Sequence, residues 1–129
     1  MITKIGIDLQ LIDEVSSSLA EFGTRYSQRL YTQRELRECE RSSEPVATAL
    51  AKRFAAKEAV LKVLDPDDVI PSWLTIEIRS ENRAIPEIFL SGEASELANR
   101  RGIVRMFLSC SQSLTSVIAT VIADIKQRP

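Results

Sequence analysis

The chain contains no histidine, and its only two cysteines, Cys39 and Cys110, lie far apart among 129 residues. Zinc sites in proteins are built from cysteine, histidine and carboxylate ligands at short, regular spacings. The two cysteines match neither such a spacing nor a redox motif. We therefore expect no zinc site, and we interpret both cysteines as buried free thiols in a reducing compartment.

The sequence also lacks long apolar runs and an excess of either charge. Its N-terminus, MITKIGIDLQLI, alternates polar and apolar residues where a signal peptide would be continuously apolar, and no run is long enough to span a membrane. The 17 basic and 18 acidic residues give a net charge of −1, which does not favour general attraction to nucleic acid. We therefore expect a cytoplasmic protein with no membrane or nucleic-acid partner, in which local groups bind any anionic ligand.

The length and pattern predict a single domain over residues 1–129, without internal repeats or low-complexity linkers. The alternation in KIGIDLQLI predicts a strand over 4–12, with Asp8 on the face opposite an aliphatic row. That row consists of Ile5, Ile7, Leu9 and Leu11. Thr32 and Glu35 have the spacing of a capping box at the start of a short helix.

The second half of the chain predicts further strands and one more short helix. WLTIEIRS (73–80) and PEIFLSG (86–92) have strand patterns separated by a turn around Glu81–Ala84, and GEASELANRRG has a helical pattern closed by Gly102. VRMFLSCSQ and TSVIATVIADI predict a final hairpin, whose second strand is apolar enough to be central in a sheet. The expected fold class is α+β, with one long helix packed on a mostly antiparallel sheet.

The long helix is predicted over Val46–Leu64, and its periodicity predicts which side is buried. At about 100° per residue, five apolar side chains fall within one arc, which is the side expected to be buried: Ala47, Leu50, Phe54, Leu61 and Leu64. Glu58 and Lys62 lie just beyond one edge of this arc, on neighbouring turns. Lys57 falls inside the arc, so its ammonium must either reach solvent or find a partner.

Glu58 and Lys62 allow two interpretations from spacing alone. A charged helix face is usually solvated, and an ion pair between residues four apart contributes a few tenths of a kcal/mol. On the other hand, the small residues Ala51 and Ala55 share the same flank, which would leave room for a ligand to approach. The spacing does not decide between a solvated ion pair and a functional site.

Two segments of the chain together resemble a known family. IGIDLQLI at 5–12 followed by LAKRFAAKEAVLKVL at 50–64 resembles the holo-acyl-carrier-protein synthase family, the small single-domain class of 4′-phosphopantetheinyl transferases. The RFAAKEA..K string with G.D about fifty residues upstream is specific, whereas either half alone is weak. The resemblance continues through RYSQRLYTQRELRECE, WLTIEI, LSGEASELANRRGI and SVIATVIA, so it covers nearly the whole chain.

The resemblance implies an enzyme that transfers the phosphopantetheine arm of coenzyme A to a serine of an apo acyl carrier protein and releases adenosine 3′,5′-bisphosphate. Breaking a pyrophosphate requires a divalent ion, so the resemblance implies a Mg²⁺ cofactor with Asp8 and Glu58 as its carboxylate ligands. Lys62 would lie at the pyrophosphate and stabilise or protonate the leaving group, and the serine proton would pass to Glu58 or to a metal-bound water. Glu58 and Lys62 are thus the expected catalytic residues.

The resemblance also implies the other ligand contacts and the assembly. Arg53 and Lys57 match family positions near the phosphates, Lys62 contacts the same group, and Gln112 stands where a coenzyme A-binding histidine is expected. A homotrimer is implied, with active sites between subunits, so that Asp8 and Glu58 of one chain face ligand groups of its neighbour.

Carrier-protein docking is where the chain departs most from the family. The family usually has an acidic residue three after the strand aspartate and an arginine six after it, where this chain has Leu11 and Glu14. That arginine helps to bind the acidic carrier protein. Its replacement by Glu14 weakens the expected docking surface and leaves Arg25 and Arg29 as the matching basic residues.

Three other departures lie around the expected nucleotide site. The family's glycine-rich turn after the long helix is replaced by the acidic DPDD at 65–68, which would repel a phosphate. Its G.P turn appears as Ala84–Ile85–Pro86, and its S.SH segment appears as SCSQ. Gln112 keeps the capacity to form hydrogen bonds but cannot titrate.

These departures leave alternatives to a working transferase. One is a non-catalytic relative that keeps the fold and binds carrier proteins or scaffolds a biosynthetic complex. Another is a metal-binding fold that acts on a different phosphate ester. The joint presence of Asp8, Glu58 and Lys62 favours the transferase, because a protein freed from this chemistry has no need of all three.

Overall fold

The computed structural model of the protein describes residues 1–80 and 85–127. The turn expected around Glu81–Ala84 therefore lies outside the described residues. In chain order the elements are β1 (Ile2–Leu11), α1 (Ile12–Phe22), α2 (Thr24–Leu30), α3 (Gln33–Arg41), α4 (Val46–Leu64), the 3₁₀ turn η1 (Trp73–Thr75), β2 (Ile76–Arg79), β3 (Glu87–Leu90), α5 (Gly92–Arg100), β4 (Ile103–Gln112) and β5 (Ser116–Ile125).

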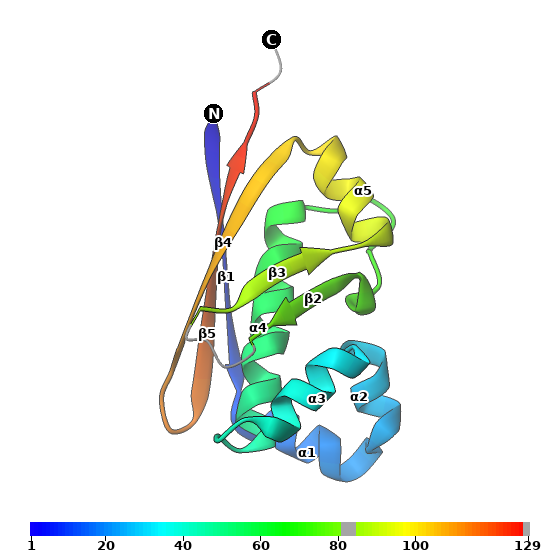
Figure 1. Cartoon of the computed structure of the whole chain (residues 1–129), viewed down its shortest axis with the longest axis vertical. Coiled ribbons are helices and arrows are strands. Elements are labelled where there is room, and N and C mark those ends of the chain that lie inside the picture. The colour runs from blue at the N-terminus through cyan, green and yellow to red at the C-terminus, as the bar shows by residue number, and fades with distance from the viewer. Residues whose placement is uncertain (81–84, 128–129) are drawn as a thin grey trace.

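The strands are all paired antiparallel, in a three-stranded sheet of order β1-β5-β4 and a two-stranded sheet of β2 and β3. The long sheet lies along one side of α4, and β2 and β3 lie on another side (Figure 1). The expected α+β class is confirmed, as is the central position of the last strand. The strands form two sheets, however, where one was expected, and the segment 73–75 at the start of the predicted strand 73–80 is a 3₁₀ turn.

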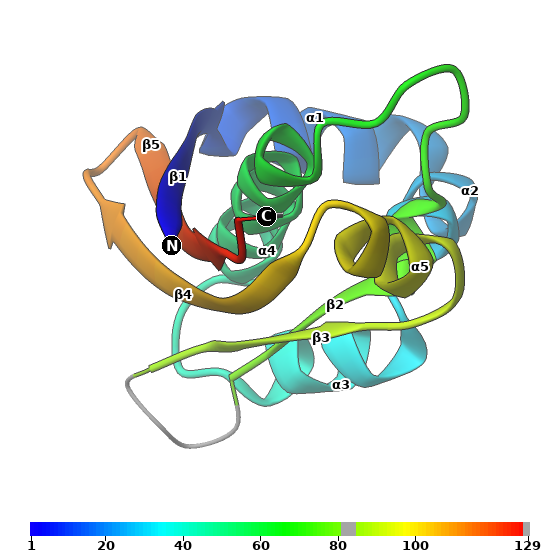
Figure 2. The same ribbon diagram turned by 90° about the horizontal axis from the view of Figure 1, so that it is seen from above.

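Helix α4 runs from Val46 to Leu64, the range expected from the sequence, and other elements surround it on nearly every side (Figure 2). It packs on β1 and β5, and also contacts α1, α3 and β2. The single buried arc is therefore wrong in part. Leu50 and Leu64 are buried, but Phe54 is only half-buried. Burial extends instead around the helix to a set of small and branched residues, namely Ala49, Ala55, Ala56, Ala59, Val60 and Val63.

Helices α1 and α2 were not expected from the sequence, whereas α3 was. The capping box of α3 is complete, because the Thr32 hydroxyl accepts from the Glu35 amide at 3.1 Å and the Glu35 carboxylate accepts from the Thr32 amide at 2.8 Å. Helix α1 begins without a side-chain cap and carries three consecutive serines, Ser16–Ser18, which are weak helix formers. Its spacing of Ile12, Val15 and Leu19 is the signal that could have predicted it.

The two faces of β1 have opposite surroundings. Gly6 is buried and Asp8 is half-buried on the face toward α4, as the alternation predicted for the side of Asp8. The aliphatic row on the other face is open in the single chain, with Ile7 55% and Leu9 53% exposed. No helix in the described part of the chain is long and apolar enough to cross a membrane.

Candidate active site

The candidate site is centred on Asp8, near the end of β1. Its side chain is 14% exposed and has two neighbours. Gln10 donates from Nε2 to Asp8 Oδ2 at 2.9 Å, and Lys62 Nζ lies 3.3 Å from Asp8 Oδ1. Gln10 was not among the expected site residues. Its position two residues along the same strand face is the signal that could have identified it.

A glycine allows β1 to approach α4 closely at this point. A Cβ atom at Gly6 would lie 2.2 Å from the Ala59 carbonyl oxygen and 3.1 Å from Val63 Cγ2. Real Cβ atoms do not approach a backbone oxygen this closely, so only glycine fits. The contact is with the same turns of α4 that carry Glu58 and Lys62. The strand and the helix therefore meet where the expected catalytic residues lie.

Ala51 and Ala55 have a different role from the one expected. Both are fully buried in the packed surface of α4. Small side chains on a helix let a sheet pack close to its backbone, as the Gly6 contact shows directly. They therefore serve close packing, and the expectation that they leave space for a ligand is wrong.

The electrostatic surroundings of Glu58 connect it to both other site residues. Partial burial raises the pKa of the Glu58 carboxyl, the negative charge of Asp8 raises it further, and the positive charge of Lys62 acts in the opposite direction. The charge of Asp8 is thus close enough to oppose the ionisation of Glu58. A carboxyl with a raised pKa is also a stronger base than a solvated one.

Lys62 turns toward β1. Its ammonium donates to the Ile7 carbonyl oxygen at 2.6 Å and forms its ion pair with Asp8, and its side chain is 53% exposed. The solvated ion pair considered from the sequence was with Glu58, four residues earlier on the helix. The structure gives Lys62 a partner on another element instead, while half of its side chain stays open to solvent.

The oxygen ligands present fit Mg²⁺ better than other common metals. Asp8 and Glu58 provide two carboxylates, and Mg²⁺ commonly takes one or two carboxylates together with phosphate and water. Among residues 1–80 and 85–127, no group of three or more His, Cys, Asp or Glu residues could hold a metal ion. Asp8 and Glu58 would therefore need further ligands, such as phosphate oxygens and water, to complete a magnesium site.

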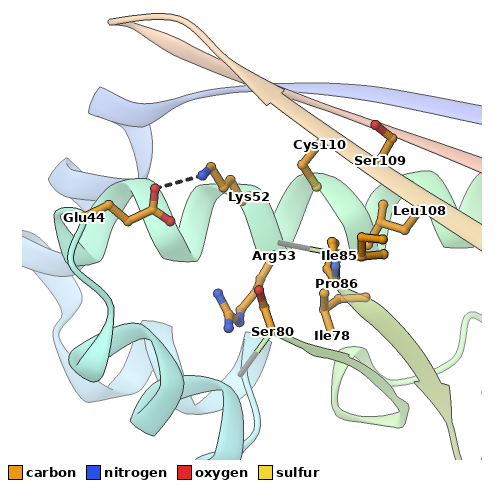
Figure 3. A pocket seen from close by; sticks show the side chains of 10 residues that line it. All are labelled: Glu44, Lys52, Arg53, Ile78, Ser80, Ile85, Pro86, Leu108, Ser109 and Cys110. Atoms are coloured by element: carbon orange, nitrogen blue, oxygen red, sulfur yellow. Dashed lines mark hydrogen bonds and ion pairs between the residues drawn. The ribbon is translucent and has the colours of Figure 1, made fainter. Parts of the chain in front are cut away.

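Arg53 lies on another flank of α4, in a pocket between α4, β2 and β4 (Figure 3). The guanidinium donates to Glu38 at 3.0 Å and to the Ala49 carbonyl at 3.4 Å. Its Nε is buried, and it has no hydrogen-bond partner among the residues that the structure describes. The pocket has a volume of about 220 Å³, and Lys52, Ser80, Pro86, Ser109 and Cys110 also line it.

The surroundings of Lys57 do not support a direct contact with coenzyme A. Its side chain is fully buried, and its ammonium lies 2.7 Å from a Glu35 carboxylate oxygen. It also donates to the carbonyl oxygens of Leu30 at 2.6 Å and Trp73 at 3.0 Å. An ammonium has three donors, and all three are used inside the protein. Lys57 therefore found a partner, the second of the two outcomes considered, and it ties α4 to α2, α3 and η1.

The remaining expected site residues lie at the surface. Glu14 is exposed in the first turn of α1, and Arg25 and Arg29 are exposed one turn apart on α2. Gln112 is exposed at the end of β4, where it pairs with Val117 on β5. All four side chains are available to a partner.

Five of the expected site residues form two groups toward opposite edges of the long sheet. Asp8 on β1 pairs with Ala119 on β5, and Ala119 pairs on its other side with Cys110 on β4. Neighbouring strands lie about 4.8 Å apart, so the β1 and β4 edges are separated by about 10 Å. Within one chain, Asp8, Glu58 and Lys62 are brought together, whereas Arg53 and Gln112 lie toward the other edge.

Two of the remaining departures lie within the described residues. Leu11 is exposed at the end of β1. Its aliphatic side chain can neither bind a metal nor accept a proton. In the acidic segment 65–68, Asp65 lies 3.8 Å from Lys4, and Asp67 lies 3.1 Å from Arg101. Two of the acids that would repel a phosphate thus have a cationic neighbour. Ala84 lies outside the described residues.

Comparison with known proteins identifies the family of this chain. Residues 4–118 match the model of the 4′-phosphopantetheinyl transferase superfamily. A holo-[acyl-carrier-protein] synthase of Paramagnetospirillum magneticum is 39% identical over 129 aligned positions, which cover 96% of this chain and 97% of that protein.

Solved structures agree with this assignment. The holo-[acyl-carrier-protein] synthase of Neisseria meningitidis is 34% identical and superposes with a TM-score of 0.80 over 93% of this chain and 96% of that one. The Helicobacter pylori holo-[acyl-carrier-protein] synthase, whose structure is a complex with coenzyme A, is 27% identical, with a TM-score of 0.79 over 94% of this chain and all of that one. The chain therefore belongs to the holo-[acyl-carrier-protein] synthase family of the 4′-phosphopantetheinyl transferase superfamily.

Proposed function

We propose that this chain, as a single domain over residues 1–129, transfers the 4′-phosphopantetheine group of coenzyme A to a serine of an apo acyl carrier protein and releases adenosine 3′,5′-bisphosphate. The observation that carries this proposal is the meeting of Asp8, Glu58 and Lys62 where β1 crosses α4. The chain's relatives are named for this activity, and one solved relative was crystallised with coenzyme A.

In the proposed reaction, the serine hydroxyl oxygen attacks the phosphorus that carries the pantetheine arm. The bond from that phosphorus to the bridging oxygen of the pyrophosphate breaks, and its electron pair remains on the departing adenosine 3′,5′-bisphosphate. Glu58 accepts the serine proton, and its raised pKa suits it to this role. Lys62, with its half-open ammonium, stabilises the charge on the leaving group or protonates it.

Asp8 and Glu58 would hold the Mg²⁺ cofactor. The ion would neutralise negative charge on the pyrophosphate oxygens. The side chains present do not supply enough positive charge for this, because among the described residues Lys62 is the one cation beside the carboxylates of Asp8 and Glu58. Gln10 orients Asp8 for this role through its hydrogen bond to Oδ2. Lys62 lies 3.3 Å from the other oxygen of the same carboxylate, Oδ1.

We further propose a homotrimer with coenzyme A bound between subunits. The outer face of the β1-β5-β4 sheet is apolar and open in the single chain. The register places Ile5, Ile122 and Phe107 side by side across its three strands, with exposures of 58%, 39% and 56%. A continuous exposed apolar face of this kind usually marks a protein interface.

The separation of the site residues supports the same assembly. Arg53, Lys52 and Gln112 lie toward one edge of the sheet, and Asp8 and Lys62 lie toward the other. A neighbouring chain that packs against the sheet could place its Arg53 pocket beside the Asp8 group of the first chain. We therefore propose that Arg53 and Gln112 bind coenzyme A. Lys57 is proposed to support the site indirectly, by holding α4 against the elements around it.

Carrier docking is proposed at Arg25 and Arg29, with Glu14 as an unfavourable neighbour for an acidic partner. The cytoplasm is the proposed compartment, because Cys39 and Cys110 are both free thiols.

The test is mass spectrometry of several apo carrier proteins after incubation with this protein, coenzyme A and Mg²⁺. We expect a mass gain of one phosphopantetheine group on at least one carrier, and no gain with Asp8→Asn or Glu58→Gln. No transfer to any carrier would favour the second candidate, a non-catalytic relative that binds carrier proteins or scaffolds a biosynthetic complex. The exposed Glu14 and Gln112, which replace an arginine and a histidine of the family pattern, are the observations that favour this candidate.

A further inference from the structure

The proposed site lies at an unfavourable end of α4 for binding an anion. Glu58 and Lys62 are in the last two turns of the helix, which ends at Leu64. The free carbonyl groups at a helix C-terminus carry partial negative charge, equivalent to about half an elementary charge. The acidic segment 65–68 follows directly, with the side chains of Asp65 and Asp67 75% and 80% exposed. Any diphosphate near Lys62 therefore meets negative charge from two sources.

The guanidinium of Arg101 contacts both the free carbonyl groups at the helix end and the acidic segment. Arg101 donates from Nε to the Leu64 carbonyl oxygen at 3.1 Å and from Nη2 to the Asp65 carbonyl oxygen at 2.6 Å. The same Nη2 lies 3.1 Å from Asp67 Oδ1. A planar guanidinium can satisfy several oxygen acceptors at once, which an ammonium cannot do in the same geometry. Arg101 thus caps the C-terminus of α4 and restrains the acidic segment in a single contact set.

Arg101 is itself held in place by the turn between α5 and β4. Its amide donates to the Leu97 carbonyl at 2.9 Å, and the following Gly102 has a φ of 74°. The Gly102 carbonyl accepts from the Lys126 amide at 2.8 Å, which ties the turn to the end of β5. α5 and this turn lie at the same end of the molecule as the C-terminus of α4 (Figure 1). The arginine is therefore presented from a fixed position.

The geometry points to Arg101 as a positioning residue of the proposed transfer: it neutralises the C-terminal end of α4 and fixes and neutralises the Asp67 carboxylate, so that neither repels the diphosphate of coenzyme A. This inference rests on the proposed function. Without Arg101, the Asp67 carboxylate, five residues after Lys62 in the chain, loses its cationic partner, and its uncompensated charge repels the diphosphate. The effect falls on the binding of coenzyme A, because the repulsion acts before any bond breaks.

The experiment measures KM for coenzyme A and kcat with saturating carrier protein, and the dissociation constant of coenzyme A by calorimetry without carrier protein. We expect Arg101→Ala to raise KM and the dissociation constant about fivefold at low salt, with a smaller change at high salt. Arg101→Lys should recover part of the loss, because the charge returns without the planar fork. The matched control is Arg37→Ala, which removes an exposed arginine of α3 at the other end of α4 and should leave both constants unchanged.

A second substitution separates this role from helix capping alone. We expect Asp67→Asn in the Arg101→Ala background to restore most of the affinity for coenzyme A, and to change it little in the parent. If Arg101 acts only as a cap, Asp67→Asn restores nothing, although thermal melts still report the lost capping contacts. That result, or an unchanged affinity in Arg101→Ala, overturns the inference.

The calorimetry distinguishes this inference from the proposed function. If the parent binds coenzyme A but transfers nothing, the proposed function fails and the affinity series still decides the role of Arg101. If the parent neither transfers the group nor binds coenzyme A, both proposals are overturned.

Discussion

Gly6 of β1 lies so close to α4 that a single added methyl group would fall 2.2 Å from the carbonyl oxygen of Ala59. This contact sets the distance between the strand that carries Asp8 and the helix that carries Glu58 and Lys62. The neighbouring atom is backbone in the middle of a helix, so it cannot turn aside as a flexible side chain could.

We expect Gly6→Ala to separate β1 from α4 and to disrupt the site. Overpacking of a closely packed contact costs about 1–3 kcal/mol, and here the helix backbone must move. Chemical denaturation should report a loss of that size, together with loss of any transfer activity. The control is Ser17→Ala, at an exposed position of α1, which should leave stability and activity nearly unchanged. A Gly6→Ala protein with unchanged stability and activity would contradict the close contact.

The pH dependence of stability should report the surroundings of Glu58. A carboxyl whose pKa is raised in the folded state binds its proton more tightly there than in the unfolded chain, so stability falls as the pH rises through the interval between the two values. The ordinary value is 4.5, and burial, followed by the charge of Asp8, raises the folded pKa above it. At neutral pH, ionised Glu58 therefore destabilises the metal-free fold.

We accordingly expect Glu58→Gln to raise the melting temperature of the metal-free protein at pH 7. The gain should shrink as the pH falls and disappear below the ordinary value of 4.5, where Glu58 is protonated in both states. Melts in the presence of a chelator, over a series of pH values, provide the measurement. Glu40→Gln, at an exposed position of α3, is the control. A gain that is independent of pH would show that Glu58 is not under this electrostatic load.

The sequence predicted α4 and the hairpin better than it predicted how α4 is surrounded. A helix wheel identifies one apolar stripe. It predicted that Phe54 and Leu61 would be buried, whereas both are only partly buried. The structure surrounds α4 with both sheets and with α1 and α3, so small residues such as Ala55 and Ala59 are buried on its other sides. Which side of a helix made of small residues is covered depends on tertiary packing, which periodicity does not contain.

The sequence predicted the residues at the centre of the candidate site better than the residues that hold its helix in place. Asp8, Glu58 and Lys62 were identified by their motif, and the structure brings them together. The role of Lys57 could not be read from the helix, because its partner Glu35 is 22 positions away in the sequence and reaches it through the capping box of α3. Arg101 was missed for a similar reason, since its three acceptors lie at the end of another helix.

The open face of the β1-β5-β4 sheet should determine the oligomeric state. If it is the trimer interface, light scattering at micromolar concentration should give about three times the chain mass. Ile7→Glu places a charge on this face and should shift the protein toward the monomer, because burying an unpaired charge costs several kcal/mol. Ser17→Glu, on the exposed side of α1, is the control. A stable monomer that retains full activity would remove the proposal of sites between subunits.

The exposed Glu14 should weaken docking of an acidic carrier protein. Long-range attraction between opposite charges raises association rates, and like charges lower them. We expect Glu14→Arg to increase the association rate with a standard fatty-acid carrier protein, mainly at low salt, and Arg25→Ala or Arg29→Ala to decrease it. Stopped-flow or surface-binding measurements at two salt concentrations would check this. If all three substitutions leave binding unaltered, the docking surface lies elsewhere.

The final prediction concerns Lys62, for which a surface role and a catalytic role differ most. The ion pair with Asp8 involves a side chain that is 53% exposed, and an exposed pair of this kind contributes about 0–1 kcal/mol to stability. A purely structural Lys62 therefore predicts that Lys62→Ala changes the melting temperature slightly and the transfer rate hardly at all. Its position beside Asp8, with about half of its side chain open to solvent, is compatible with either role.

A lysine that stabilises charge on the departing phosphate acts mainly in the transition state. Removing one such group commonly costs on the order of a hundredfold or more in rate, about 2.7 kcal/mol. We therefore expect Lys62→Ala to reduce the single-turnover rate of transfer to an apo carrier protein by at least that order, with little change in the affinity for coenzyme A. Lys62→Arg should recover only part of the rate, because the charge returns but the proton donor does not. Lys52→Ala, on the same helix but in the Arg53 pocket, is the contrasting variant, whose effect should appear in the affinity for coenzyme A and not in the rate. Equal single-turnover rates for the parent and Lys62→Ala would exclude the catalytic role and leave the ion pair with Asp8 as the function of this side chain.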